Sequence, residues 1–163
     1  MKIKNLIITF VSAIALLIST STISFAKVVG DKIILGAAVS LTGKYSSNGV
    51  HTQNGYNLAV DRINSMGGVK VGGKSYKFEI IYYDDESNSG RAAQLAERLI
   101  KQDGVQFMLG PYSSGLTKAM APVTEKYQIP MVEANGASRS LFTKGYKYLF
   151  AVLAPANLYL DVA

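Results

Sequence analysis

Hydrophobic and polar positions follow two different rhythms along this chain. Residues 32–39 (KIILGAAV) form a nearly continuous apolar run with β-branched members, and such a run predicts a buried strand. Apolar residues then recur at helical spacing and predict a helix over about residues 53–66, which a pair of glycines ends. The apolar stripe of this helix consists of Tyr56, Ala59, Val60 and Ile63.

The alternation of strand and helix continues to the end of the chain. A Gly-Gly turn at residues 71–74 leads into the second strand. Ser87 or Asn88 can cap the helix that follows, and Asp103-Gly104 closes it. The further strands are predicted at residues 76–83, 105–109, 129–133 and 148–153, and the further helices around the apolar stripe 92–100, over residues 114–127 and from residue 155 onward.

Strands that alternate with helices of this length predict βαβ units and a parallel sheet. Crossovers between parallel strands are right-handed, so the expected fold class is α/β, a doubly wound parallel sheet with helices on both faces. The last predicted helix has only begun when the chain reaches Ala163, with no stop signal before it. We therefore expect the chain to be an incomplete part of a longer protein, with one face of its sheet uncovered.

The first 26 residues have a different pattern from the rest. A short basic stretch up to Lys4 precedes the uncharged apolar segment 6–18, and Ser24-Phe25-Ala26 offers small residues at a cleavage position. These are the three parts of a secretory signal peptide, and we expect cleavage after Ala26. A membrane anchor is the alternative, but the apolar segment is too short to span a bilayer comfortably. Residues 27–163 would then form the mature domain.

Composition narrows the functional classes. The formal net charge is +6, but Lys2 and Lys4 lie in the leader, and no Lys/Arg-rich run follows. The mild excess is typical of a solvated surface and does not predict nucleic-acid binding. The chain has no cysteine, so it has neither disulfides nor a cysteine for a lipid anchor. These features favour a freely soluble periplasmic protein.

Three segments that follow predicted strands are rich in small and hydroxyl residues: 40–48, 110–115 and 134–138. Ligands of open α/β sheets bind beyond the carboxyl ends of the strands, where strand order reverses. The second segment also opens a helix, so its free amides, with Ser113 and Ser114, could hold a carboxylate or small oxyanion. Simple capping of the helix by one of these serines explains the pattern equally well.

Other chemical motifs are incomplete. No Gly-Lys-Ser/Thr follows residues 110–115, and the first strand lacks the glycine turn of a dinucleotide site. His51 is the single histidine, which predicts a surface residue in a loop or near the start of a helix and no zinc site. The acidic cluster 84–86 could bind a hard cation, but a polar strand end before a helix is favoured. We expect binding without catalysis, cofactor or metal.

The order of these segments resembles the branched-chain amino-acid-binding family of periplasmic proteins, the Leu/Ile/Val-binding type. The matching segments run through most of residues 32–153, and as a set they are specific. They are 36–43 (GAAVSLTG), 54–55 (NG), 59–64 (AVDRIN) with 67–68 (GG), 83–85 (YDD), 110–115 (GPYSSG), 121–123 (APV) and 129–130 (IP).

The resemblance implies a type I solute-binding fold of two α/β lobes that close on a ligand like a hinge, with this chain supplying the N-terminal lobe. Within it, Ser114 matches the serine that binds the ligand carboxylate, next to Ser113. Asn135 and Ala137 match contact positions, and Ser138 can substitute for a hydroxyl missing at Ala137. Tyr45 or Asn48 lies where the family places a residue against the ligand side chain. Asn48 replaces an aromatic residue of some members, which weakens the case for an apolar ligand.

The implied function is solute capture for an ABC importer, with amino acids or similar small polar molecules as ligands. Its partner would be the transporter permease in the inner membrane, and the binding protein would act as a monomer. A ligand-sensing receptor or regulator of the same fold is the alternative, because fold alone does not define function. An exported enzyme would need catalytic residues beyond Ala163, and a sugar-binding relative would use more aromatic and charged groups.

Overall fold

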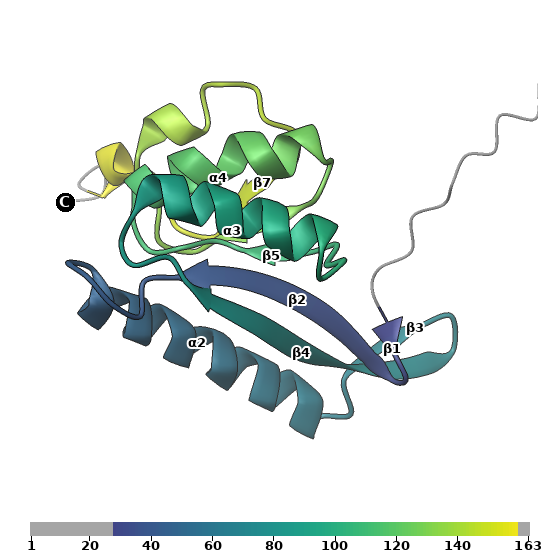
Figure 1. Ribbon diagram of the computed structural model, residues 1–163. Coiled ribbons are helices and arrows are strands. Elements are labelled where there is room, and N and C mark those ends of the chain that lie inside the picture. Colours follow the sequence, from purple (N-terminus) through teal and green to yellow (C-terminus); the bar gives the residue numbers. More distant parts are fainter. Residues whose placement is uncertain (1–27, 160–163) are drawn as a thin grey trace, which may run out of the picture.

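The computed structural model describes residues 28–159, and the predicted signal peptide lies outside this range (Figure 1). The strands are β1 (Val28–Val29), β2 (Lys32–Val39), β3 (Val69–Val71), β4 (Lys74–Asp84), β5 (Met108–Leu109), β6 (Met131–Glu133) and β7 (Leu149–Ala151). The helices are α2 (Ser46–Ser65), α3 (Ser89–Lys101) and α4 (Ser114–Lys126), with single 3₁₀ turns η1 (Arg139–Leu141) and η2 (Ala156–Leu158).

The strands form one mostly parallel sheet in the order β3-β4-β2-β5-β6-β7. β2 is parallel to both β4 and β5, and β6 is parallel to β5 and β7, which confirms the predicted α/β class. Two antiparallel additions were not predicted, since β1 pairs with β2 and β3 forms a hairpin with β4. The hairpin turns at the Gly-Gly segment, where both glycines have positive φ.

The strand order places a topological switch beside β2. The chain leaves β2 through α2 to reach β4 on one side, and then returns through α3 to reach β5 on the other side. Connections that depart from neighbouring strands in opposite directions leave a crevice between them at the carboxyl edge of the sheet. The segments that follow β2 and β5 therefore flank the expected ligand position.

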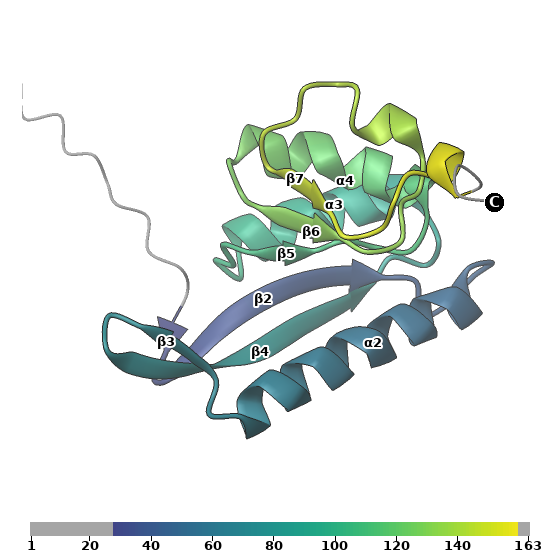
Figure 2. The same cartoon turned by 180° about the vertical axis from the view of Figure 1, so that it is seen from behind.

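The two faces of the sheet are covered unequally. α3 and α4 pack side by side on one face, and α2 lies alone along β2 and β4 on the other (Figures 1 and 2). The main core fills the space between the sheet and the helices α3 and α4. It contains Ile34, Ala38, Ala92, Leu95, Ala96, Leu99, Val105, Met108, Leu116, Met120, Ala121 and Met131.

The opposite face remains partly open, as the sequence predicted. In α2 only Gly49 and Thr52 are buried, and Leu58 is 71% exposed. Beyond α2, the neighbouring strands β6 and β7 present Val132 and Phe150 with exposed fractions of 40% and 52%. Figure 2 shows α2 running along β2 and β4, with β5, β6 and β7 beyond it.

The predicted start of α2 was wrong, because the helix begins at Ser46 and not near residue 53. Its first turns carry small and polar residues, so they show no apolar stripe that could predict a helix. Gly49 lies so close to the end of β2 that a Cβ atom there would be 1.8 Å from the Ser40 carbonyl oxygen. Asn48 and His51 are therefore helical residues. His51 is exposed near the start of α2, which confirms the predicted surface position, and only the loop position considered for it was wrong.

Strands β5, β6 and β7 are shorter than the apolar runs that predicted them. Val105 shows why: it is buried, but its amide donates to the Leu99 carbonyl oxygen at the end of α3 and not to another strand. An apolar run thus predicts which residues are buried, and the buried segment is longer than the part that pairs with a neighbouring strand. The helix expected from residue 155 appears as the 3₁₀ turn η2, and residues 160–163 lie outside the described range. Across residues 28–159, no helix combines the length and apolar character needed to cross a membrane.

Candidate functional site

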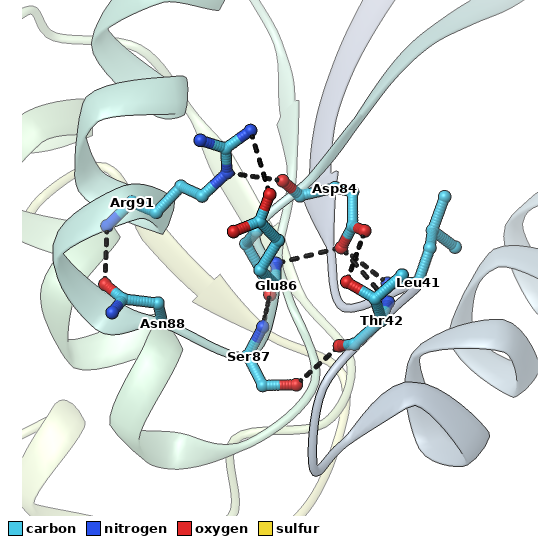
Figure 3. Close-up of polar contacts among 8 residues, drawn as sticks. Leu41, Thr42, Asp84, Glu86, Ser87, Asn88 and Arg91 are labelled. Carbon is cyan, nitrogen blue, oxygen red and sulfur yellow. Dashed lines mark hydrogen bonds and ion pairs between the residues drawn. The ribbon is translucent and has the colours of Figure 1, made fainter.

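The segment after β2 is held in place by the carboxylate of Asp84 at the end of β4 (Figure 3). Asp84 accepts hydrogen bonds from the Leu41 amide at 2.9 Å, the Thr42 hydroxyl at 2.7 Å and the Glu86 amide at 2.8 Å. Burial alone would raise the pKa of Asp84, but these hydrogen bonds outweigh it and lower the pKa below its ordinary value. The ionised carboxylate therefore fixes the end of β2 against the end of β4.

The rest of the acidic cluster also serves the loops. Asp85 is fully buried and accepts from the Ser40 hydroxyl at 2.6 Å, while burial raises its pKa. Glu86 pairs with Arg91, and the Asn88 side chain caps α3 as predicted (Figure 3). The carboxyl groups of this cluster thus bind neighbouring loops and the Arg91 side chain. This is the arrangement expected for a polar strand end before a helix, the interpretation that the sequence favoured for residues 84–86. Residues 28–159 contain no group of three potential metal ligands.

Ser113 and Ser114 have different roles at the start of α4. Ser113 is the N-cap residue, with φ of +79°, and its Oγ accepts from the Leu116 amide at 3.4 Å. Ser114 Oγ accepts from the Ser138 amide at 3.0 Å, so it joins the segment after β5 to the segment after β6. Its own O–H group can still donate to a ligand. Among the described residues, the amides of Ser114 and Gly115 have no acceptor, as is usual in the first turn of a helix.

The segment after β6 turns around the buried carboxyl group of Glu133. One oxygen of Glu133 accepts short hydrogen bonds from the Asn135 and Gly136 amides, and the other has no partner among the described residues. Burial raises the pKa of this carboxyl group, and the two amides lower it only in part. The turn continues to Ala137, whose carbonyl oxygen accepts from the Ala156 amide at 2.7 Å.

A pocket of about 370 Å³ lies between the first turns of α2 and the ends of β5 and β6. Gly55 and Ala134 are its small lining residues. The polar side chains that line it are Asn48, His51, Thr52, Tyr56, Tyr112 and Asn135. This volume lies within the range of small-molecule sites, and the position matches the topological switch.

Two tyrosines shape this pocket. The Tyr56 hydroxyl donates to the Gly110 carbonyl oxygen at 2.7 Å, which ties α2 to the end of β5, and burial raises the pKa of Tyr56. The ring of Tyr112 meets the ring of Tyr45 edge to face, with centroids 5.5 Å apart. Tyr45 also packs against the main core, and it is not among the lining residues of the pocket.

The seven candidate ligand residues all lie at the carboxyl edge of the sheet, but they form separate groups. Asn48 and Asn135 line the pocket together, whereas Ser114 contacts the Ser138 amide. The Ser138 hydroxyl lies 2.8 Å from that of Ser140. Ser113 caps α4, Tyr45 packs on Tyr112, and Ala137 contributes a backbone contact to residue 156.

Sequence reasoning missed Thr52, Tyr56 and Glu133. Thr52 and Tyr56 lie four and eight residues after Asn48, on one face of a helix, and this spacing becomes visible only when the helix begins at Ser46. Glu133 has one local signal, an acid at the end of an apolar strand. Its burial depends on the close approach of Gly110 and Gly136.

The fold and this pocket define a class: an α/β lobe with a ligand-sized crevice at its topological switch. The sequence profile of the periplasmic binding proteins matches residues 32–159. The chain therefore belongs to this family, and the resemblance to its Leu/Ile/Val-binding type is confirmed by the relatives below.

Three relatives illustrate the similarity. A Leu-, Ile-, Val-, Thr- and Ala-binding protein of Pseudomonas aeruginosa is 26% identical over 82% of this chain and 34% of its own length. A branched-chain amino acid transporter substrate-binding protein of Streptococcus pneumoniae, solved with isoleucine, is 32% identical with a TM-score of 0.68, over 76% of this chain and 34% of that one. A solute-binding protein of Rhodopseudomonas palustris, solved with 3,4-dihydroxybenzoic acid, is 27% identical with a TM-score of 0.62, over 74% and 31%. The chain thus spans about a third of the length of these relatives.

Proposed function

We propose that residues 27–163 form the N-terminal lobe of an extracytoplasmic solute-binding protein that delivers amino acids or similar small polar solutes to an ABC importer. One observation carries this proposal: the segments after β2, β5 and β6 meet at the switch point, where Ser114 joins two of them. Membership in the periplasmic binding protein family supports it.

The proposed contact is with the ligand carboxylate. The Ser114 hydroxyl uses an oxygen lone pair for the Ser138 amide, so its hydrogen remains for an anion. The amides of Ser114 and Gly115 and the positive end of the α4 dipole favour negative charge at the same place. Isoleucine and 3,4-dihydroxybenzoic acid, the ligands of two relatives, share a carboxylate and little else. A second lobe would then close over the ligand.

The remaining parts of the proposal concern the protein in the cell. Residues 1–26 act as a cleaved signal peptide and direct the protein to the periplasm. There it binds its solute as a monomer, without catalysis, and presents the closed form to the permease. A sensor of the same fold would differ in its partner, so copurification with a permease or with a signalling domain separates the two roles.

Native mass spectrometry of the natural gene product, purified from the cell envelope, tests this proposal. We expect a chain that starts at Lys27 and carries an amino-acid-sized adduct, which is lost on unfolding. Calorimetry with free amino acids and with their carboxamides then checks the role of the carboxylate. A protein that retains residues 1–26, carries no adduct and binds no small carboxylate would contradict the proposal.

A further inference from the structure

The pocket beside α2 contains hydrogen-bonding side chains that the lobe itself does not use. Within residues 28–159, the side-chain polar groups of four lining residues have no hydrogen-bond partner: Asn48, His51, Tyr112 and Asn135. The side chains of Asn48 and His51 are exposed to solvent, and those of Tyr112 and Asn135 are half-buried. Thr52 and Tyr56 differ, because their hydroxyls donate to the carbonyl oxygens of Asn48 and Gly110. Four side chains from α2 and from the segments after β5 and β6 thus converge with free donors and acceptors.

The chemistry of these four groups constrains what can occupy the pocket. A branched alkyl group would take them out of water and give them no partner, and this costs free energy for each group left unpaired. A ligand group with its own donors and acceptors would replace the lost water contacts. The two asparagines offer amide donors and carbonyl acceptors, and Tyr112 and His51 add further hydrogen-bonding atoms.

The charge of the pocket narrows the choice further. None of its lining residues is Lys, Arg, Asp or Glu. The nearby carboxyl group of Glu133 is fully buried and faces the Asn135 and Gly136 amides. A charged side chain of the ligand would therefore find no fixed counter-charge in the lining of this pocket, so a neutral polar group fits best.

We propose that this pocket selects ligands whose side chain is neutral and forms hydrogen bonds, such as a carboxamide or hydroxyl, over branched aliphatic ones. The inference rests on the proposed function, since it assigns the side-chain end of a ligand whose carboxylate lies at Ser114. Asn48 and Asn135 determine the specificity, and they face the ligand from α2 and from the segment after β6.

Calorimetry on the full-length natural protein, freed of copurified ligand, tests the proposal with isosteric pairs. Asparagine and leucine have the same shape, as do threonine and valine, and each pair differs only in hydrogen-bonding groups. We expect the polar member of at least one pair to bind at least about tenfold more tightly, because a site built for hydrogen bonds rejects the analogue that lacks them.

Variants identify the residues responsible. Asn48→Leu and Asn135→Leu should each reduce the preference for the polar member by about tenfold or more, by removing the groups that bind it. Asn54→Leu is the matched control, because Asn54 lies exposed on α2 and outside the pocket. Circular dichroism of each variant verifies folding, and His51→Leu replaces a variant that does not fold.

The outcomes separate this inference from the proposed function. If the aliphatic member of each pair binds as tightly as the polar one, or more tightly, the selectivity inference is wrong and the proposed function stands. If neither member of any pair binds, and other small carboxylates also fail, both are wrong. An unchanged preference in the Asn48 and Asn135 variants would also overturn the inference.

Discussion

The Ser114 hydroxyl can donate one hydrogen bond and accept others, and the fold uses only its accepting side. Ser114→Ala should therefore weaken ligand binding by about 1–3 kcal/mol, the cost of losing a hydrogen bond to a charged group. Calorimetry with the copurified ligand measures this difference. Ser89→Ala is the control, since Ser89 is the first residue of α3 as Ser114 is of α4. Equal losses of binding free energy in the two variants would show that Ser114 does not contact the ligand.

Glu133 should make stability depend on pH. Burial raises its pKa above the ordinary value of 4.5, so the native state keeps its proton to higher pH than the unfolded chain does. Stability associated with the neutral acid is then fully present below pH 4.5 and is lost as the pH rises through the native pKa. Glu133→Gln cannot ionise, and its carbonyl oxygen can still accept from the Asn135 and Gly136 amides.

We therefore expect the stability of Glu133→Gln, relative to the natural protein, to increase as the pH rises above 4.5, the ordinary pKa of this carboxyl group. Urea unfolding at a series of pH values measures this difference. Asp85 is also buried with a raised pKa, but it is present in both proteins and cancels in the comparison. Asp61→Asn, at an exposed position on α2, serves as the control. A relative stability that does not change with pH would contradict the argument.

At the scale of elements, the position of α2 depends on one glycine. A Cβ atom at Gly49 would lie 1.8 Å from the Ser40 carbonyl oxygen, whereas a Cβ atom at Gly55 would meet nothing within 4 Å. Gly49→Ala should destabilise the protein by about 1–3 kcal/mol, the usual cost of overpacking. Gly55→Ala in the same helix should stabilise it by about 0.5–1 kcal/mol, because alanine favours helix.

Thermal unfolding of these two variants provides a matched comparison. Both add one methyl group to α2, so helix propensity alone predicts the same gain in stability for both. Opposite signs would show that contact with the end of β2 sets the helix position. A Gly49→Ala variant as stable as Gly55→Ala would mean that α2 can move away from β2 at no cost.

The order of strands and helices was predictable because apolar periodicity is local, as the buried stripe of α3 illustrates. The predicted residues Ala92, Leu95, Ala96 and Leu99 are indeed buried there. The start of α2 was not predictable in this way, since its first turns carry no apolar stripe and lie against the Ser40 carbonyl oxygen through Gly49. The local pattern therefore identified elements such as α3, whose apolar residues are buried along their whole length. It failed at the start of α2, whose position depends on a contact with a residue distant in sequence.

At the scale of the whole molecule, the side of the sheet shared with α2 carries an open apolar surface. Val132 and Phe150 are partners in the register of β6 and β7, and both are exposed. Residues 27–163 produced alone should self-associate, because adjoining exposed apolar side chains favour burial against another surface. Size-exclusion chromatography with light scattering measures this association.

The double variant Val132→Thr with Phe150→Thr should shift the same chain toward the monomer. Leu58→Thr is the control, because Leu58 is 71% exposed and belongs to α2 and not to β6 or β7. If residues 27–163 are monomeric with the natural Val132 and Phe150, the predicted self-association through this surface is wrong.

The α/β class, the order of elements and the three polar segments at the carboxyl edge of the sheet were all predictable from the amino-acid sequence alone. This was possible because apolar periodicity is local and parallel strands bring their carboxyl ends to one edge. Which side chains come together at this edge depends on how the elements pack in three dimensions. Asn48 and Asn135 line one pocket, and Ser114 Oγ accepts from the Ser138 amide, because β2 lies between β4 and β5 and because Gly49 lets α2 approach β2. Strand order and helix placement depend on contacts between distant segments, which no local pattern contains.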